Sequence, residues 1–214
     1  MRYIELKRRS LYQSKSYFIL DIDTLLYPPL YIIKKLSDTK AVDIIQLRDK
    51  SSIKSKIVAL AKSIRMLLKK NKILFIINDY IDIVKSVDAD GLHLGQNDLP
   101  LPLARRILGK EKIIGISCHS LEEAEEAERE GADYISIGPI FTTPLKPEYH
   151  PLGVGILKKI KNKINIPYFP VGGIDLSNMN RLISLGINRV AFSRLLGRAR
   201  DLDYIIEELN RKFQ

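Results

Sequence analysis

Short apolar runs alternate along this chain with longer stretches in which apolar residues recur every three or four positions. The short runs predict buried strands, and the longer stretches predict amphipathic helices. We expect strands at residues 17–21, 42–48, 73–78, 91–94, 112–117, 134–138, 167–171 and 189–193. We expect helices at about 29–37, 52–70, 80–87, 100–108, 120–130, 153–162, 176–185 and 201–212.

The order of these elements indicates the fold class. Eight strands, each followed by a helix, predict an α/β protein with a (β/α)8 TIM barrel. The alternative, a doubly wound open sheet, usually has a glycine-rich phosphate turn after its first strand, whereas residues 20–23 here read Leu-Asp-Ile-Asp. No linker is visible, so residues 16–214 are predicted to form one barrel domain. Residues 1–15 are predicted to be a basic N-terminal appendage, a helix across the barrel bottom.

Charge and cysteine content narrow the class of protein. The formal net charge is +10, but only residues 1–15 contain a dense basic cluster. That cluster leaves nucleic-acid binding as a rival interpretation, although no aromatic-basic stacking motif accompanies it, so we expect no nucleic-acid partner. The one cysteine, Cys118, is predicted to be a buried thiol and fits a cytoplasmic location. No secretory signal is visible, and no apolar run approaches the roughly 18 residues that span a membrane.

Residues 44–50, Ile-Ile-Gln-Leu-Arg-Asp-Lys, end a predicted strand with polar side chains. Gln46, Arg48 and Lys50 are two positions apart, so they share one face of the strand. Ile45 and Leu47 then face the helices, and the polar set points into the barrel. Active sites of such barrels lie at the carboxyl ends of the strands. We therefore expect these side chains to bind a small phosphorylated substrate.

The other predicted strands also end in polar residues and glycines. Inward-facing positions at these ends are Asn78, Gly91, His93, Gly95, Gly115, Ser117, His119, Ser136 and Gly138. Asp79 and Asp98 add two carboxylates to the same rim, and carboxylates beside cations indicate Mg²⁺ bridging to phosphate oxygens. Gly172 and Gly173, before a helix that starts near Asp175, indicate an anion site, because the N-terminus of a helix favours phosphate.

These features also have purely structural interpretations. Asp79 and Asp98 would each be suited to cap the helix that follows. Arg48 would be able to pair with Asp49 at the surface. For His93, a hydrogen-bonded interior position is favoured over a metal site, because no other His or Cys has ligand spacing.

Six motifs, in order along residues 17–200, resemble those of the thiamine-phosphate synthase family. They read Q-L-R-D-K, I-N-D, D-G-L-H-L-G-Q-N-D, G-I-S-C-H-S, G-P-I-F-T-T-P-L-K and V-G-G-I. The resemblance implies a (β/α)8 transferase, often a homodimer, that joins a hydroxymethylpyrimidine diphosphate to a thiazole phosphate. Its products are thiamine phosphate and pyrophosphate. The substitution is dissociative, so it needs no strong general base.

The resemblance also implies roles for individual residues. The pyrimidine diphosphate is held by Gln46, Leu47, Arg48, Asp49, Lys50 and Asn78. The thiazole phosphate is held by Thr143, Pro144, Leu145, Gly173, Ser193 and Arg194. The implied cofactor, Mg²⁺, is bound by Asp79 and Asp98. The implied catalytic residues, which face or stabilise the departing pyrophosphate, are Arg48, Lys50, Lys146 and Ser117.

Two departures from the family pattern keep rival functions open. The usual T-x-T-K loop has Leu145 in place of its second threonine, and Arg194 follows Ser193 where small residues are usual. We expect weaker or altered binding of thiazole phosphate from these changes. A thiazole tautomerase with His119 as its acid-base group is one rival. A non-catalytic barrel that binds a phosphate ligand is the other.

Overall fold

The computed structural model describes residues 2–144 and 150–213. Its strands are β1 Ser16–Asp21, β2 Ile44–Arg48, β3 Leu74–Asn78, β4 Gly91–Leu94, β5 Ile113–Cys118, β6 Tyr134–Ile137, β7 Tyr168–Pro170 and β8 Val190–Phe192. Its α-helices are α1 Arg2–Gln13, α2 Pro29–Thr39, α3 Lys54–Leu68, α4 Ile81–Ser86, α5 Leu101–Leu108, α6 Leu121–Arg129, α7 Gly155–Lys163, α8 Leu176–Ser184, α9 Arg194–Gly197 and α10 Leu202–Phe213.

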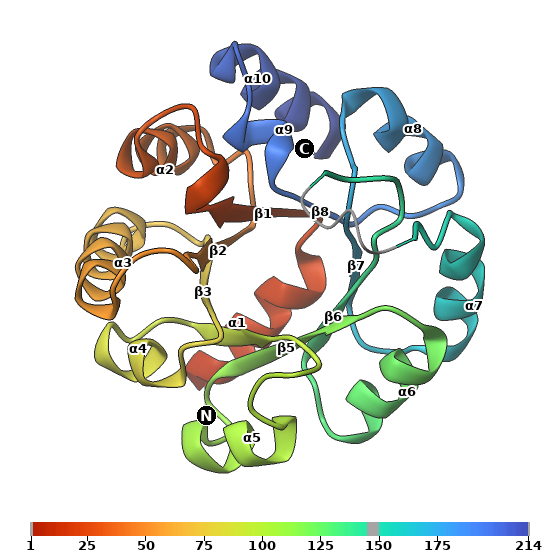
Figure 1. The fold of residues 1–214 in the computed structure, drawn as a ribbon, viewed down its shortest axis with the longest axis horizontal. Coiled ribbons are helices and arrows are strands. Elements are labelled where there is room, and N and C mark those ends of the chain that lie inside the picture. The colour runs from red at the N-terminus through yellow and green to blue at the C-terminus, as the bar shows by residue number, and fades with distance from the viewer. Residues whose placement is uncertain (1, 145–149, 214) are drawn as a thin grey trace.

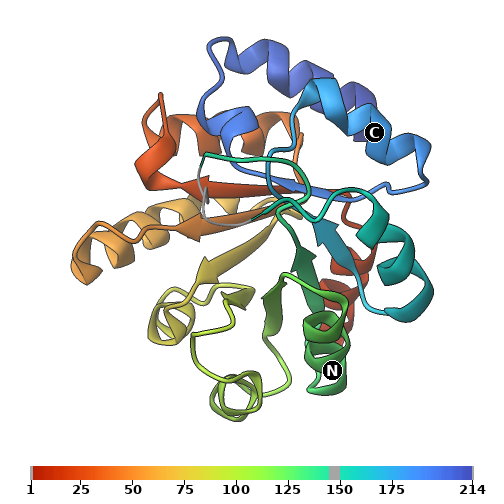
Figure 2. The ribbon, with the colours of Figure 1, turned by 45° about the vertical axis from the view of Figure 1, so that its right-hand side comes forward.

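The eight strands form a single parallel sheet in the order β7-β6-β5-β4-β3-β2-β1-β8. The end strands β7 and β8 contact each other, so the sheet curls into a nearly closed ring with helices around it (Figures 1 and 2). The predicted (β/α)8 barrel is therefore confirmed. No helix in the described part of the chain is long and apolar enough to cross a membrane.

Alternation along the strands separates two layers of core. Ile45 and Leu47 are buried in the outer core, between the sheet and the helices. Ile44 belongs to the inner core that fills the barrel, together with Tyr17 and Tyr134. The strand phase expected for residues 44–48 is thus confirmed, because successive side chains of a strand point to opposite faces.

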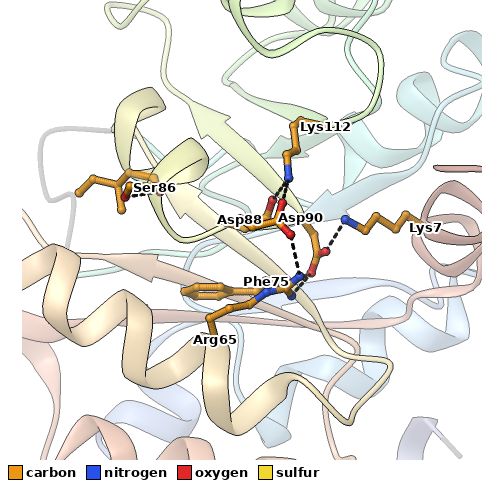
Figure 3. Close-up of polar contacts among 9 residues, drawn as sticks. Lys7, Arg65, Phe75, Ser86, Asp88, Asp90 and Lys112 are labelled. Atoms are coloured by element: carbon orange, nitrogen blue, oxygen red, sulfur yellow. Dashed lines mark hydrogen bonds and ion pairs between the residues drawn. The ribbon is translucent and has the colours of Figure 1, made fainter. Parts of the chain in front are cut away.

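Helix α1 lies across the centre of the ring in Figure 1 and closes its amino-terminal end. Leu11 is fully buried in the inner core. The ammonium group of Lys7 lies 2.7 Å from a carboxylate oxygen of Asp90, whose other oxygen accepts hydrogen bonds from the backbone N–H of Phe75 and from Arg65 (Figure 3). Cations of the N-terminal cluster therefore pair with carboxylates at the barrel bottom.

Candidate functional site

A cavity of about 560 Å³ opens at the carboxyl ends of the strands. Of the predicted site residues, it is lined by Gln46, Arg48, Asn78, Ser117, Thr143, Pro144, Gly173, Ser193 and Arg194. These residues come from the strands or strand ends of β2, β3, β5 and β8 and from the loops after β6 and β7. The barrel therefore brings together side chains that are widely separated in the sequence, at the end where barrel enzymes place their chemistry.

Five predicted site residues do not line this cavity. The side chain of Leu47 is buried in the outer core, away from the barrel interior. The carboxylate of Asp49 accepts hydrogen bonds from the N–H groups of Ser51 and Ser52, so it holds the turn after β2. The other three, which form a group beside the cavity, are Lys50, Asp79 and Asp98. Leu145 and Lys146 lie outside the described residues.

Arg48 is held by a carboxylate from the neighbouring strand. Its guanidinium donates a 2.6 Å hydrogen bond to Oδ2 of Asp21, at the end of β1. The alternative surface pair with Asp49 is not the one observed. Burial raises the pKa of Asp21, and Arg48 opposes that rise. Oδ1 of Asp21 is buried and has no partner among the described residues. Because Asp21 also lines the cavity, this oxygen is suited to accept a hydrogen bond from a ligand.

Asp79 and Asp98 lie side by side at the ends of β3 and β4. Burial and the adjacent Asp98 carboxyl raise the pKa of Asp79 to about 6, and Lys50 opposes this rise. The ammonium of Lys50 lies 3.4 Å from Oδ2 of Asp79. Oδ2 of Asp98 accepts a 2.7 Å hydrogen bond from the N–H of Gly95. Because burial and the neighbouring carboxyl both disfavour the charged form of Asp79, this pair is suited to a cation.

The structural alternative for these carboxylates was helix capping. The N-cap residues are Tyr80 for α4 and Pro100 for α5, and neither helix has a side-chain cap among the described residues. Asp79 instead adopts a left-handed backbone conformation, with φ of 62°, which aspartate tolerates better than most residues. Among residues 2–144 and 150–213, no group of three or more His, Cys, Asp or Glu side chains forms a metal site.

The opposite side of the cavity is built from β7, β8 and α9. Gly172 and Gly173 have positive φ, and a Cβ on Gly173 would lie 2.5 Å from the carbonyl oxygen of Thr142. The expected anion site at the start of α8 is not available in full, because Asp175 already accepts hydrogen bonds from the Ser177 and Asn178 N–H groups. An anion here would depend instead on the glycine backbone and on the residues that follow β8.

Helix α9 was not predicted from the sequence, and it starts at the end of β8. Arg194, which begins this helix, and Arg198, which follows its last residue, line the cavity. The hydroxyl oxygen of Ser193 is buried and has no partner among the described residues. This side of the cavity therefore offers two cations and an unpaired hydroxyl, which is a suitable lining for a phosphate group.

The interior of the barrel contains the histidine that was expected to be hydrogen-bonded. The Nδ1 atom of His93 lies 2.9 Å from the hydroxyl of Tyr134, and its Nε2 atom lies 2.9 Å from the hydroxyl of Ser117. A second histidine, His119, lines the cavity, and its Nδ1 atom lies 3.1 Å from Oε2 of Glu123. Cys118 is buried, as expected, and burial raises its pKa to about 12.

Comparison with known proteins assigns this chain to a family. The family model described as thiamine monophosphate synthase matches residues 17–196, which is most of the chain. The chain belongs to the thiamine monophosphate synthase family.

Individual members of the family agree with this assignment. The thiamine-phosphate synthase of Halalkalibacterium halodurans is 48% identical over 158 residues, covering 73% of this chain and 75% of that protein. The enzyme of Clostridium tetani is 37% identical over 194 residues, covering 90% and 92%. The solved structure of thiamine phosphate pyrophosphorylase from Pyrococcus furiosus matches with a TM-score of 0.85 and 31% identity over 96% of each chain. The resemblance found in the motifs is therefore confirmed.

Sequence reasoning missed several residues that line the cavity. Among them are Asp21, which ends β1, Thr24, which follows β1, and Arg198, which follows α9. Asp21 had a usable signal, because it shares the inward phase of Tyr17 and Ile19 at the end of the first strand. Thr24 and Arg198 had none, since both lie in irregular or very short elements without a repeating pattern.

Proposed function

We propose that this chain is a thiamine-phosphate synthase. It couples 4-amino-5-hydroxymethyl-2-methylpyrimidine diphosphate with thiazole phosphate and releases pyrophosphate. One observation supports this proposal above the others: the cavity is lined both by Arg48, Asn78 and Ser117, from β2, β3 and β5, and by Ser193 and Arg194 at the end of β8. Two sets of polar side chains in one cavity suit a reaction that joins two phosphorylated substrates.

On the β2 side, the residues would bind the diphosphate and the pyrimidine. Arg48 donates hydrogen bonds to phosphate oxygens and stays oriented because Asp21 holds its guanidinium. The amide of Gln46 faces the ring edge of the pyrimidine. Ser117 would donate a hydrogen bond to an oxygen of the departing pyrophosphate, and the positive charge of Lys146 would be the role that the family resemblance gives it at the same group. These donors stabilise the charge that develops as the leaving group departs.

The carboxylate pair fits a magnesium ion. Burial and the adjacent Asp98 carboxyl raise the pKa of Asp79, and a divalent cation bound beside the pair would favour the charged form of Asp79. Magnesium is commonly bound by one or two protein carboxylates together with substrate phosphates, so two carboxylates suffice. When bound, Mg²⁺ would neutralise negative charge on the diphosphate. Asp79 and Asp98 would hold it, and Lys50 would remain beside them.

A second candidate function is favoured by His119. Its ring lies in the cavity beside Glu123, and a histidine held by a carboxylate is suited to move a proton in a thiazole tautomerase reaction. Such an isomerisation would not depend on Asp79 and Asp98. Magnesium dependence therefore distinguishes the two functions.

The direct test is an assay of the purified chain with both substrates and Mg²⁺, with thiamine phosphate as the product measured. We expect product only when both substrates and the metal are present, and none from an Asp79→Ala/Asp98→Ala double variant. Asp82→Asn is the matched control, because Asp82 is a surface carboxylate paired with Lys54. A folded wild-type protein that binds both phosphates without forming product would overturn the proposal. Metal-independent isomerisation of the thiazole would replace it with the tautomerase.

A further inference from the structure

A continuous chain of hydrogen bonds crosses the barrel interior beneath the cavity. The amide Nε2 of Gln46 donates to the hydroxyl of Tyr17 over 2.6 Å. The hydroxyls of Tyr17 and Tyr134 are 2.8 Å apart. Tyr134 contacts Nδ1 of His93, whose Nε2 contacts Ser117, each over 2.9 Å. Both tyrosines are buried beneath the cavity, whereas Gln46 and Ser117, at the two ends of this series of hydrogen bonds, line the cavity.

The chemistry of these groups sets the direction of the chain. The Tyr17 hydroxyl accepts from Gln46, so its own proton must go to Tyr134, the other hydroxyl in contact with it. Tyr134 then donates to Nδ1 of His93, which places the histidine proton on Nε2 and directs it to Ser117. Each hydroxyl accepts one hydrogen bond and donates another, which is the arrangement that satisfies buried hydroxyls. Burial raises the pKa of both tyrosines, which keeps both protons in place.

The direction determines what each end presents to a ligand. Nε2 of Gln46 donates to Tyr17, whereas its Oε1 has no hydrogen-bond partner among the described residues and is not sealed from the cavity. Gln46 therefore presents an acceptor. Ser117 accepts from His93 and, over 3.4 Å, from the hydroxyl of Ser136, so its own proton is available to the cavity. Ser117 therefore presents a donor.

Packing keeps the two tyrosines in place. Tyr17 and Tyr134 each contact the ring of Phe169 edge-on, with centroids 5.3 and 5.8 Å away. Gly115 lies against Tyr134, and a Cβ at that glycine would come within 2.0 Å of its ring. Neither tyrosine ring is therefore free to turn away from the chain without displacing the inner core.

We propose that Tyr17, Tyr134 and His93 are positioning residues that lock Gln46 as a hydrogen-bond acceptor and Ser117 as a donor. The acceptor selects a ring substituent that carries N–H, such as the amino group of an aminopyrimidine, over a carbonyl at the same place. The donor faces an anionic oxygen. The inference about substrate selectivity rests on the proposed function, whereas the donor-to-acceptor direction of the hydrogen bonds does not depend on it.

The direction of the hydrogen bonds is tested by a measurement that does not require enzymatic activity. Nitrogen NMR of the unliganded wild-type protein with ¹⁵N-labelled histidine reports which ring nitrogen of His93 carries the proton. We expect the neutral ring to be protonated at Nε2, and a His93→Gln variant assigns its signals among the three histidines of the chain. Protonation at Nδ1 would reverse every donor and acceptor in the chain and overturn the proposal, whether or not the protein is a synthase.

Selectivity is tested with the aminopyrimidine diphosphate and its counterpart with oxygen in place of the amino group. In Tyr17→Phe and Tyr134→Phe, we expect the preference in kcat/KM for the amino compound to fall about tenfold, the effect of losing about one buried hydrogen bond. The KM for thiazole phosphate should not change. Tyr168→Phe is the matched control, because Tyr168 lies in β7 outside the chain of hydrogen bonds.

Equal losses for both pyrimidines, or unchanged selectivity in folded variants, would overturn the proposal. If the wild-type protein makes no product, the same comparison is made with Kd values of the two diphosphates from calorimetry. A tenfold loss of amino preference in binding would then support the positioning role even though the proposed reaction had failed.

Discussion

Asp21 and Arg48 form an ion pair of 2.6 Å between the first two strands of the barrel. The strand register places these two residues directly opposite each other. Because Asp21 is buried and Arg48 is partly exposed to the cavity, the carboxylate fixes the direction in which the guanidinium points. The pair therefore supplies an oriented cation where the diphosphate would bind.

Replacing Asp21 should impair binding at that cation. In Asp21→Asn, Arg48 keeps a neighbour of the same shape but loses its charged partner. We expect kcat/KM for the pyrimidine diphosphate to fall about tenfold, since a hydrogen bond to a charged group contributes about 1.5–3 kcal/mol. Steady-state kinetics measure the change, and Asp38→Asn, at an exposed pair with Lys34, serves as control. Wild-type kinetics in Asp21→Asn would show that Arg48 needs no support.

Helix α1 should contribute to stability through Lys7. In Lys7→Met, Asp90 loses one partner of a buried ion pair but keeps Arg65 and the Phe75 N–H. We expect the free energy of unfolding, measured with denaturant, to fall by about 1–3 kcal/mol. Lys34→Met, at an exposed pair, should change it by less than about 0.5 kcal/mol. Similar values for the two variants would mean that the bottom ion pair adds no stability.

Gly115 should not tolerate a side chain. The added methyl of Gly115→Ala would overlap the ring of Tyr134, so the inner core would have to shift. We expect a loss of about 2 kcal/mol or more in the free energy of unfolding. Gly155→Ala is the matched change, because a Cβ there meets nothing within 4 Å. It should be neutral or stabilise by about 0.5 kcal/mol. Thermal unfolding of both variants is the measurement. Equal stability of Gly115→Ala and Gly155→Ala would contradict this prediction.

Leu145 should weaken the binding of thiazole phosphate. The family loop has threonine at this position, and a hydroxyl is able to donate to phosphate where leucine is not. Leu145→Thr is expected to lower the apparent KM for thiazole phosphate and to leave the KM for the pyrimidine diphosphate unchanged. Arg194→Ala, at the cavity wall, is expected to raise the same KM. If Leu145→Thr has no effect, the loop departure does not influence this substrate.

Cys118 should be chemically inert in the folded protein. Burial raises its pKa to about 12, so the reactive thiolate is scarce at pH 8 and a reagent has little access. The direction of the pKa change means that reactivity should stay low until the pH rises well above 8. A colorimetric disulfide reagent should label the native protein slowly and the guanidinium-unfolded protein rapidly. Rapid native labelling would contradict the burial.

The local pattern of the sequence was enough to predict the barrel and the faces of its strands. Gln46 points inward and Leu47 outward because side chains of any strand alternate, whatever the neighbouring strand is. The glycines and polar residues at the strand ends predicted the end of the barrel at which the cavity lies.

Which residues meet across the barrel was decided by the tertiary structure. The pairing of Asp21 with Arg48 and the contact of Tyr17 with Tyr134 depend on strand order and register. Helix α9 and the capping box at Asp175 likewise changed the expected phosphate side. A strand's periodicity follows from its own backbone geometry, whereas these contacts join segments far apart in the chain and arise only when the sheet closes.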